Sequence, residues 1–273
     1  MQNDPILLGI ASTKELDYDP WIKAGFRFGD KGTHTSRTMM LEELTLLFQE
    51  CADSASREDY LKAINDHNCL GKKTTATRKL SSQRLSELYG LEPKILLFRV
   101  LRNCWEADKD GRPLLALLTA LARDPLLRIT STPILNMKTG EELARQQLKD
   151  ALNESVRERL NENTLDKVVR NASSSWTQSG HLKGRGRKTR CKISPTPIVT
   201  AYALLLGFIL GSRSHGLFKT LWTKVLDTPQ EELVDLALDA KRLGFLDISQ
   251  AGGVIEILVT RMLIEEERRL IFE

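Results

Sequence analysis

The sequence predicts a mainly α-helical fold, a two-part helical bundle with helix-turn-helix and winged-helix elements and short β-hairpins. Leu, Ala, Glu, Lys and Arg fill long periodic stretches, whereas aromatic residues make up only 6% of the chain, a composition typical of helices. Clusters of Gly, Pro, Ser and Thr are short, so long irregular segments are not expected. At about 150 residues per domain, 273 residues predict two domains, which we place at 1–135 and 136–273.

The amino-terminal half begins with a turn-rich segment at 30–36 and continues with helical periodicity. A helix is predicted at 37–50, where apolar residues recur at intervals of three and four. A serine N-cap precedes a short amphipathic helix at 57–67, and a glycine-containing turn leads into a further helix at 74–89. Two helices joined by a tight turn indicate helix-turn-helix character.

Two strongly apolar helices at 93–105 and 113–122 each begin with proline, which favours the first turn of a helix, and they should form the core scaffold. The segment 129–135 (ITSTPIL) is rich in β-branched residues and contains Pro133. A short β-rich piece is therefore expected there, at the boundary between the two domains.

The second half is predicted to contain one or two helices at 141–160 and a capped helix at 161–178, which Ser179 and Gly180 end. The segment 181–193 alternates small and basic residues and contains two glycines, a pattern that suits a short hairpin. Helix, helix and basic hairpin follow one another in the order of a winged helix.

An uncharged stretch at 193–212 raises the question of a membrane span. Its continuous apolar run covers only 201–210 with two further residues, and prolines at 195 and 197 precede it. A span needs about 20 predominantly apolar residues, so a buried helix is expected and membrane association is the alternative.

The carboxy-terminal end is predicted to add amphipathic helices at 217–226 and 229–243 and two short strands in 244–258. These strands suggest a second small winged-helix-like unit, used for packing or for a protein partner. The segment 227–247 carries six acidic and two basic residues, so this face should not contact phosphate.

Positive charge is concentrated in two stretches, although the net charge of the whole chain is only +4. Both stretches lack acidic residues and are interleaved with Ser, Thr, Asn and Gln, the residue types that contact phosphates and base edges. Like charges that repel one another are best tolerated where a polyanion neutralises them. The candidate DNA-binding residues are Lys72, Lys73, Arg78, Lys79 and Arg84 in the first stretch, and Lys167, Arg170, Asn171, Ser174, Gln178, His181, Lys183, Arg185, Arg187, Lys188 and Arg190 in the second.

A solvated basic surface without a ligand is the alternative for both stretches, and binding to anionic lipid is a further alternative for the second. His181 is interpreted as a phosphate contact or a surface residue.

The sequence contains no recognisable catalytic motif. Its four histidines are isolated, and GxSxG, HExxH, phosphate-binding and EF-hand patterns are absent. Four separated cysteines without a CxxC pair exclude a zinc ribbon or a thioredoxin-type site and favour a reducing compartment. No signal peptide is expected, so we predict a cytoplasmic protein that needs neither a metal nor a cofactor.

Two segments carry a family resemblance: 29–44 (GDKGTHTSRTMMLEEL) and 174–188 (SSWTQSGHLKGRGRK). Together with the helical body, they resemble the BrxA family of bacterial BREX phage-defence systems. Members are encoded beside methyltransferase, ATPase and alkaline-phosphatase-like components, and the resemblance implies a non-catalytic, DNA-binding accessory protein.

The function predicted from the sequence is therefore binding of double-stranded DNA, mainly through its backbone, inside a larger defence assembly that includes other proteins. An adaptor that binds RNA or an acidic protein partner is the first alternative. A nuclease assembled from acidic residues distant in sequence is the second.

Overall fold

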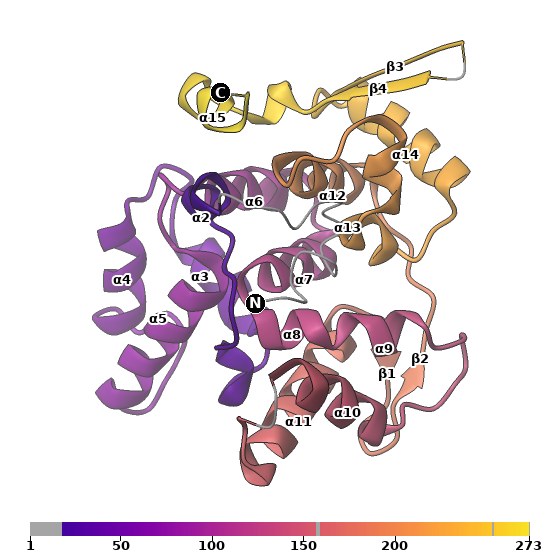
Figure 1. The fold of residues 1–273 in the computed structure, drawn as a ribbon. Helices are drawn as coiled ribbons and strands as arrows, with labels where there is room; N and C mark the ends of the chain where they lie inside the picture. Colours follow the sequence, from indigo (N-terminus) through magenta and orange to yellow (C-terminus); the bar gives the residue numbers. More distant parts are fainter. Residues whose placement is uncertain (1–17, 157–158, 253, 273) are drawn as a thin grey trace.

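The computed structural model describes residues 18–156, 159–252 and 254–272. The chain is mainly helical, as the composition predicts, and its strands form two antiparallel pairs, β1 with β2 and β3 with β4 (Figure 1). Helices of the first half and the central α12 lie between the β3–β4 pair at one end and the β1–β2 pair with α10 and α11 at the other.

The first half contains the helices that the periodicity predicts, with ends shifted by a few residues. These helices are α3 (Leu41–Glu50), α4 (Arg57–Asn65), α5 (Thr75–Tyr89), α6 (Leu96–Ala107) and α7 (Arg112–Arg123). The chain also forms α2 (Asp19–Ala24), which was not predicted, and the 3-10 turn η1 (Thr33–Thr35) within the turn-rich segment. A capping box of Ser56 and Asp59 starts α4, and the Thr74 hydroxyl caps α5. Helices α4 and α5 pack against each other and are connected by residues 66–74, and the helix-turn-helix character stays a prediction.

The predicted β-rich piece at 129–135 is wrong. The chain forms two short helices there, α8 (Pro125–Ile129) and α9 (Ser131–Leu135). Asp124 caps α8 by accepting hydrogen bonds from the N–H groups of Leu126 and Leu127. The hydroxyls of Thr130 and Ser131 donate to carbonyls three residues earlier. In this segment these side chains therefore stabilise helical turns.

The second half continues with α10 (Arg145–Val156), α11 (Glu162–Gln178), β1 (Leu182–Lys183), β2 (Thr189–Arg190) and α12 (Pro197–Ile209). The hairpin is antiparallel, with Leu182 opposite Arg190. The segment predicted as one helix at 217–226 is divided into η2 (Ser214–Lys219) and α13 (Leu221–Lys224), because the Thr220 side chain caps a new helix. The chain ends with α14 (Gln230–Arg242), β3 (Asp247–Ala251), β4 (Val254–Leu258), η3 (Thr260–Met262) and α15 (Glu265–Phe272).

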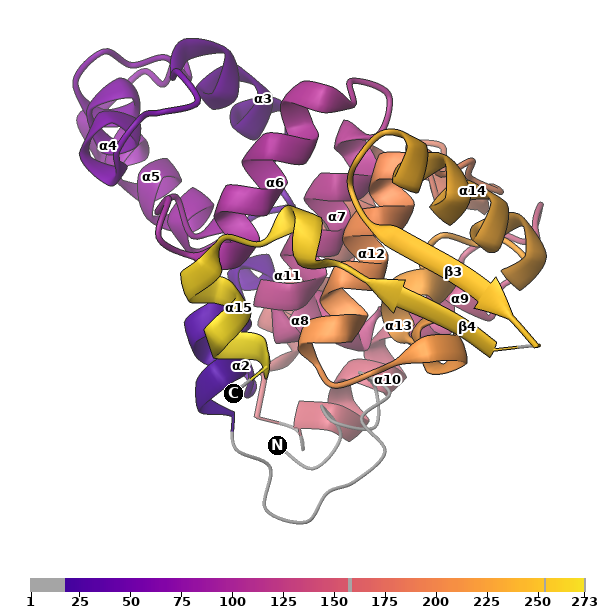
Figure 2. The same cartoon turned by 90° about the horizontal axis from the view of Figure 1, so that it is seen from above.

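Helix α12 is the centre of the molecule. Every residue from Ile198 to Ile209 is buried, and the helix contacts α6 and α7 on one side and α13 and α14 on the other (Figure 2). The expectation of a buried helix is confirmed. None of the helices in the described part of the chain combines the length and the apolar character needed to cross a bilayer.

One cluster of buried apolar residues runs from Ala24 to Leu263 and includes both halves of the chain. Helix α12 of the second half packs against α6 and α7 of the first. The division at 135 stays a prediction, but the two halves share a core.

Candidate nucleic-acid interface

Helix α11 presents the first part of the second basic stretch. The Asn161 side chain caps the helix by accepting a hydrogen bond from the Thr164 N–H at 2.9 Å. Positions 167, 170, 174 and 177 recur at helical spacing and form one stripe. Lys167 and Arg170 are exposed on it, while Ser174 and Thr177 are half-buried.

The β1–β2 hairpin extends this stripe. Lys183, Arg185 and Arg187 are exposed, and the Lys188 ammonium donates to the Thr177 hydroxyl at 2.7 Å. Gly184 has φ +106°, and a Cβ there would lie 2.1 Å from the Arg187 carbonyl oxygen, so the turn requires glycine. We call this set the α11–hairpin surface: Lys167, Arg170, Lys183, Arg185, Arg187 and Lys188.

Neighbouring charges leave the α11–hairpin surface positive. Asp166 lies next to the stripe, but it is paired with Lys149 at 2.7 Å. Burial, and to a lesser extent repulsion from Arg145 of α10, lowers the pKa of Lys188. Within the part of the chain that the structure describes, the ion pair of Arg187 is a long, exposed one with Glu142 at 3.7 Å. Such a pair is weak and leaves Arg187 able to contact a phosphate.

Arg190 is not part of the exposed surface, and its prediction as a DNA contact is wrong. Its side chain is 2% exposed and pairs with Asp227 at 2.9 Å. The guanidinium also donates to the carbonyls of Ile134, His181 and Cys191. Asp227 therefore compensates the charge of Arg190, and the hydrogen bonds of the guanidinium hold the base of the hairpin against the core.

His181 is likewise buried, so the interpretation as a phosphate contact or a surface residue is wrong. One ring nitrogen lies 2.9 Å from the Ser179 hydroxyl and the other 2.8 Å from the Val225 carbonyl oxygen. Burial lowers the pKa of His181 to about 4, and repulsion from Arg190 adds to this shift. The ring is neutral at pH 7 and has a structural role.

Acidification should therefore destabilise the protein through His181. Its pKa is lower in the folded than in the unfolded chain, so the unfolded state binds more protons as the pH falls from 6.5 toward 4. Protonation of His181 in the unfolded state should therefore lower the free energy of unfolding by about 2 kcal/mol as the pH falls from 7 to 5. Urea melts at both pH values should show a smaller decrease in His181→Gln than in the wild type, and an equal decrease would contradict the assignment.

Two other candidate DNA-binding residues, Asn171 and Gln178, form hydrogen bonds within the fold. The Asn171 amide donates to the carbonyl of His34 at 2.8 Å, and the Gln178 carbonyl oxygen accepts from the Leu41 N–H at 3.2 Å. Both hold the segment between η1 and α3 against α11, so neither is poised to read base edges.

The first basic stretch is largely paired within the protein. Lys72 lies 3.0 Å from Glu43, Arg84 lies 2.7 Å from Glu87, and Arg78 donates to two backbone carbonyls. Lys73 and Lys79 remain exposed. Helix α5 lies across the molecule from the β1–β2 hairpin (Figure 1), so the fold does not join the two stretches into one surface.

A buried polar cluster around His34 has no counterpart among the residues predicted from the sequence. His34 is not isolated: one ring nitrogen lies 2.7 Å from Asp124 Oδ2 and the other 2.8 Å from the Ser175 hydroxyl. All three residues are almost fully buried. The Asp-His-Ser spacing is not visible in the sequence, because the partners come from η1, the start of α8 and the middle of α11.

The Asp124–His34–Ser175 contacts follow one another as in the Asp-His-Ser triad of a hydrolase, but the serine is not accessible to a substrate. The Ser175 oxygen also accepts from the Met39 N–H at 2.8 Å and contacts the Asn171 carbonyl at 2.9 Å. No substrate carbonyl can approach a hydroxyl that is buried and surrounded in this way. The cluster fastens the 29–44 segment to α8 and α11.

No protein-family model and no curated protein matches this chain. Within the ranges that the structure describes, no group of three or more His, Cys, Asp and Glu residues is arranged to hold a metal ion.

Proposed function

We propose that the chain is a cytoplasmic, non-catalytic protein that binds double-stranded DNA mainly through its backbone. The observation that carries this proposal is the α11–hairpin surface, where exposed cations of a helix stripe and a following hairpin lie together. A helix followed by a basic two-stranded wing suits a duplex, because the helix can approach a groove while the wing contacts the adjacent phosphates.

The contacts that the surface offers are phosphate contacts. Its six named residues are all Lys or Arg, whereas Asn171 and Gln178 are engaged in the fold. Because Lys and Arg neutralise phosphates without reading sequence, binding should show little sequence preference and a steep dependence on salt.

The resemblance of segments 29–44 and 174–188 to the BrxA family extends this proposal to a role as an accessory of a BREX-type phage-defence system. The structure gives the two segments a common location, since the first is bound to α11 and the second is the end of α11 with the hairpin. Other proteins of such an assembly would be further partners.

The triple variant Lys183→Ala/Arg185→Ala/Arg187→Ala should bind duplex DNA about 100-fold more weakly, because each lost phosphate contact removes roughly 1 kcal/mol. The slope of log K against log salt should become shallower by about 2 to 3. Fluorescence anisotropy between low and physiological salt measures both quantities.

The matched control removes three exposed lysines outside both basic stretches, Lys109, Lys219 and Lys224, and should change affinity little. If both triple variants lost affinity for duplex DNA equally, the loss would come from the change in net charge alone. That result would contradict a localised interface. Tighter binding of RNA than of duplex DNA would favour the adaptor alternative, and cleavage of DNA in Mg²⁺ would favour the nuclease.

A further inference from the structure

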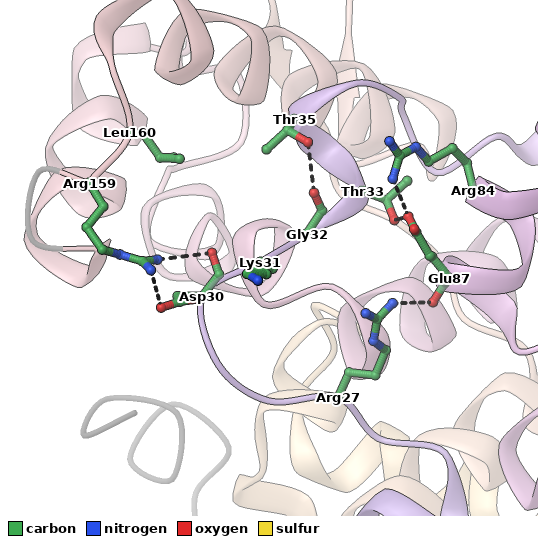
Figure 3. A pocket seen from close by; sticks show the side chains of 10 residues that line it. All are labelled: Arg27, Asp30, Lys31, Gly32, Thr33, Thr35, Arg84, Glu87, Arg159 and Leu160. Carbon is green, nitrogen blue, oxygen red and sulfur yellow. Dashed lines mark hydrogen bonds and ion pairs between the residues drawn. The ribbon is translucent and has the colours of Figure 1, made fainter. Parts of the chain in front are cut away.

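A cavity of about 410 Å³ lies between the segment before η1, helix α5 and the chain that leads into α11 (Figure 3). Four cationic side chains line it, Arg27, Lys31, Arg84 and Arg159, together with the carboxylates of Asp30 and Glu87. Its size is in the range of small-molecule sites.

The two carboxylates of the cavity are already neutralised. Glu87 accepts from Arg84 at 2.7 Å and from the Thr33 hydroxyl at 2.9 Å, and Asp30 pairs with Arg159 at 2.5 Å. Burial alone would raise the pKa of Glu87, but these hydrogen bonds lower it below its usual value. Each acid is therefore paired with one arginine.

Two positive charges remain without a carboxylate. The exposed Arg27 guanidinium donates to the backbone carbonyl of Glu87 at 3.3 Å, and neither it nor the exposed Lys31 ammonium pairs with a carboxylate among the described residues. The buried Nε of Arg84 also lacks an acceptor. A buried donor without an acceptor is costly, so Arg84 Nε favours an acceptor in the cavity, and the two exposed cations beside it favour one that is anionic.

The wall that carries Lys31 is held in place before any ligand arrives. A Cβ on Gly32 would lie 2.1 Å from Asp124 Oδ1, so the backbone packs directly on that carboxylate. His34 is bound to Asp124 and Ser175, and Thr33 to Glu87. A prearranged wall reduces the ordering cost of binding.

We propose that this cavity binds the phosphate dianion of a phosphate monoester. Two uncompensated cations match its charge of about −1.5 to −2 at pH 7, and the volume leaves room for the group that carries the phosphate. A mononucleotide and the 5′-phosphate end of a nucleic acid strand share this chemistry. The proposal is independent of the α11–hairpin surface.

Calorimetric titrations with inorganic phosphate, adenosine 5′-monophosphate and short duplexes with and without 5′-phosphates would test the proposal. The duplexes are used with the hairpin triple variant, so that backbone contacts there do not contribute. Saturable binding of the nucleotide identifies a small-molecule ligand, and preference for the phosphorylated duplex identifies a strand end. Both results support the proposal.

Lys31→Gln and Arg27→Gln should each weaken binding of the phosphate ligand roughly tenfold or more, since each removes a charge-assisted hydrogen bond. Lys109→Gln, at an exposed site away from the cavity, should bind like the wild type. Thermal melting of each variant shows whether the fold is retained. The proposal is overturned if none of the phosphate ligands binds at millimolar concentration, or if Lys31→Gln and Arg27→Gln both bind as tightly as the wild type.

Discussion

Asp124→Ala should lower the free energy of unfolding by several kcal/mol, because it leaves buried donors without an acceptor, each at a cost of about 1–3 kcal/mol. Asp124 accepts from the His34 ring at 2.7 Å and from the backbone N–H groups of His34, Leu126 and Leu127. The variant therefore loses the cap of α8 as well as the His34 contact.

The direction of the Asp124 pKa shift agrees with this expectation. Burial opposes the charged carboxylate, but attraction to His34 and the hydrogen bonds outweigh burial and lower the pKa. The stabilisation is thus present above the unfolded pKa of 3.8 and is lost as the pH falls below it.

Denaturant melts at pH 7 would compare Asp124→Ala with Asp239→Ala, which removes a similar carboxylate from an exposed ion pair with Arg242. The exposed pair should contribute less than about 1 kcal/mol. If both variants melt alike, the buried cluster does not stabilise the fold.

Leu205→Asp should unfold the protein or lower the free energy of unfolding by several kcal/mol, because it places an unpaired charge in the core. Leu205 is 0% exposed on α12, and the same holds for Leu206. Since α12 contacts both α7 and α14, the loss should spread through both halves of the chain.

The matched control is Leu238→Asp, the same substitution at a position of α14 that is 37% exposed. It should keep a cooperative thermal transition near that of the wild type, whereas Leu205→Asp should lose it. A cooperative transition of normal midpoint in Leu205→Asp would contradict the position of α12 at the centre.

Local patterns were sufficient to predict most helices. The prolines and the apolar run of α12 predict its start, its length and its burial, and the Asn161 cap of α11 is visible in the sequence. The helices at 125–135 were not predictable from composition, because a cap from Asp124 and hydroxyl contacts outweigh the strand preference of β-branched residues.

Pairing between distant residues limited the prediction of the site. A count of charges treats Arg187 and Arg190 alike, but Asp227 neutralises only Arg190. Lys72 and Arg84 belong to an acid-free stretch, yet Glu43 and Glu87 lie beside them in the folded chain. His34 lacks any neighbour in sequence that suggests Asp124 or Ser175. Such contacts depend on the tertiary structure.

The buried Arg190 has a consequence for the thermodynamics of binding. Because its guanidinium bonds to three carbonyls and to Asp227, the base of the hairpin is already ordered before a ligand arrives. Only the exposed side chains at the tip then lose rotamer freedom, about 0.5–1.5 kcal/mol for each one immobilised. Association should therefore bury little new apolar surface and show a heat-capacity change close to zero, unlike a segment that folds as it binds.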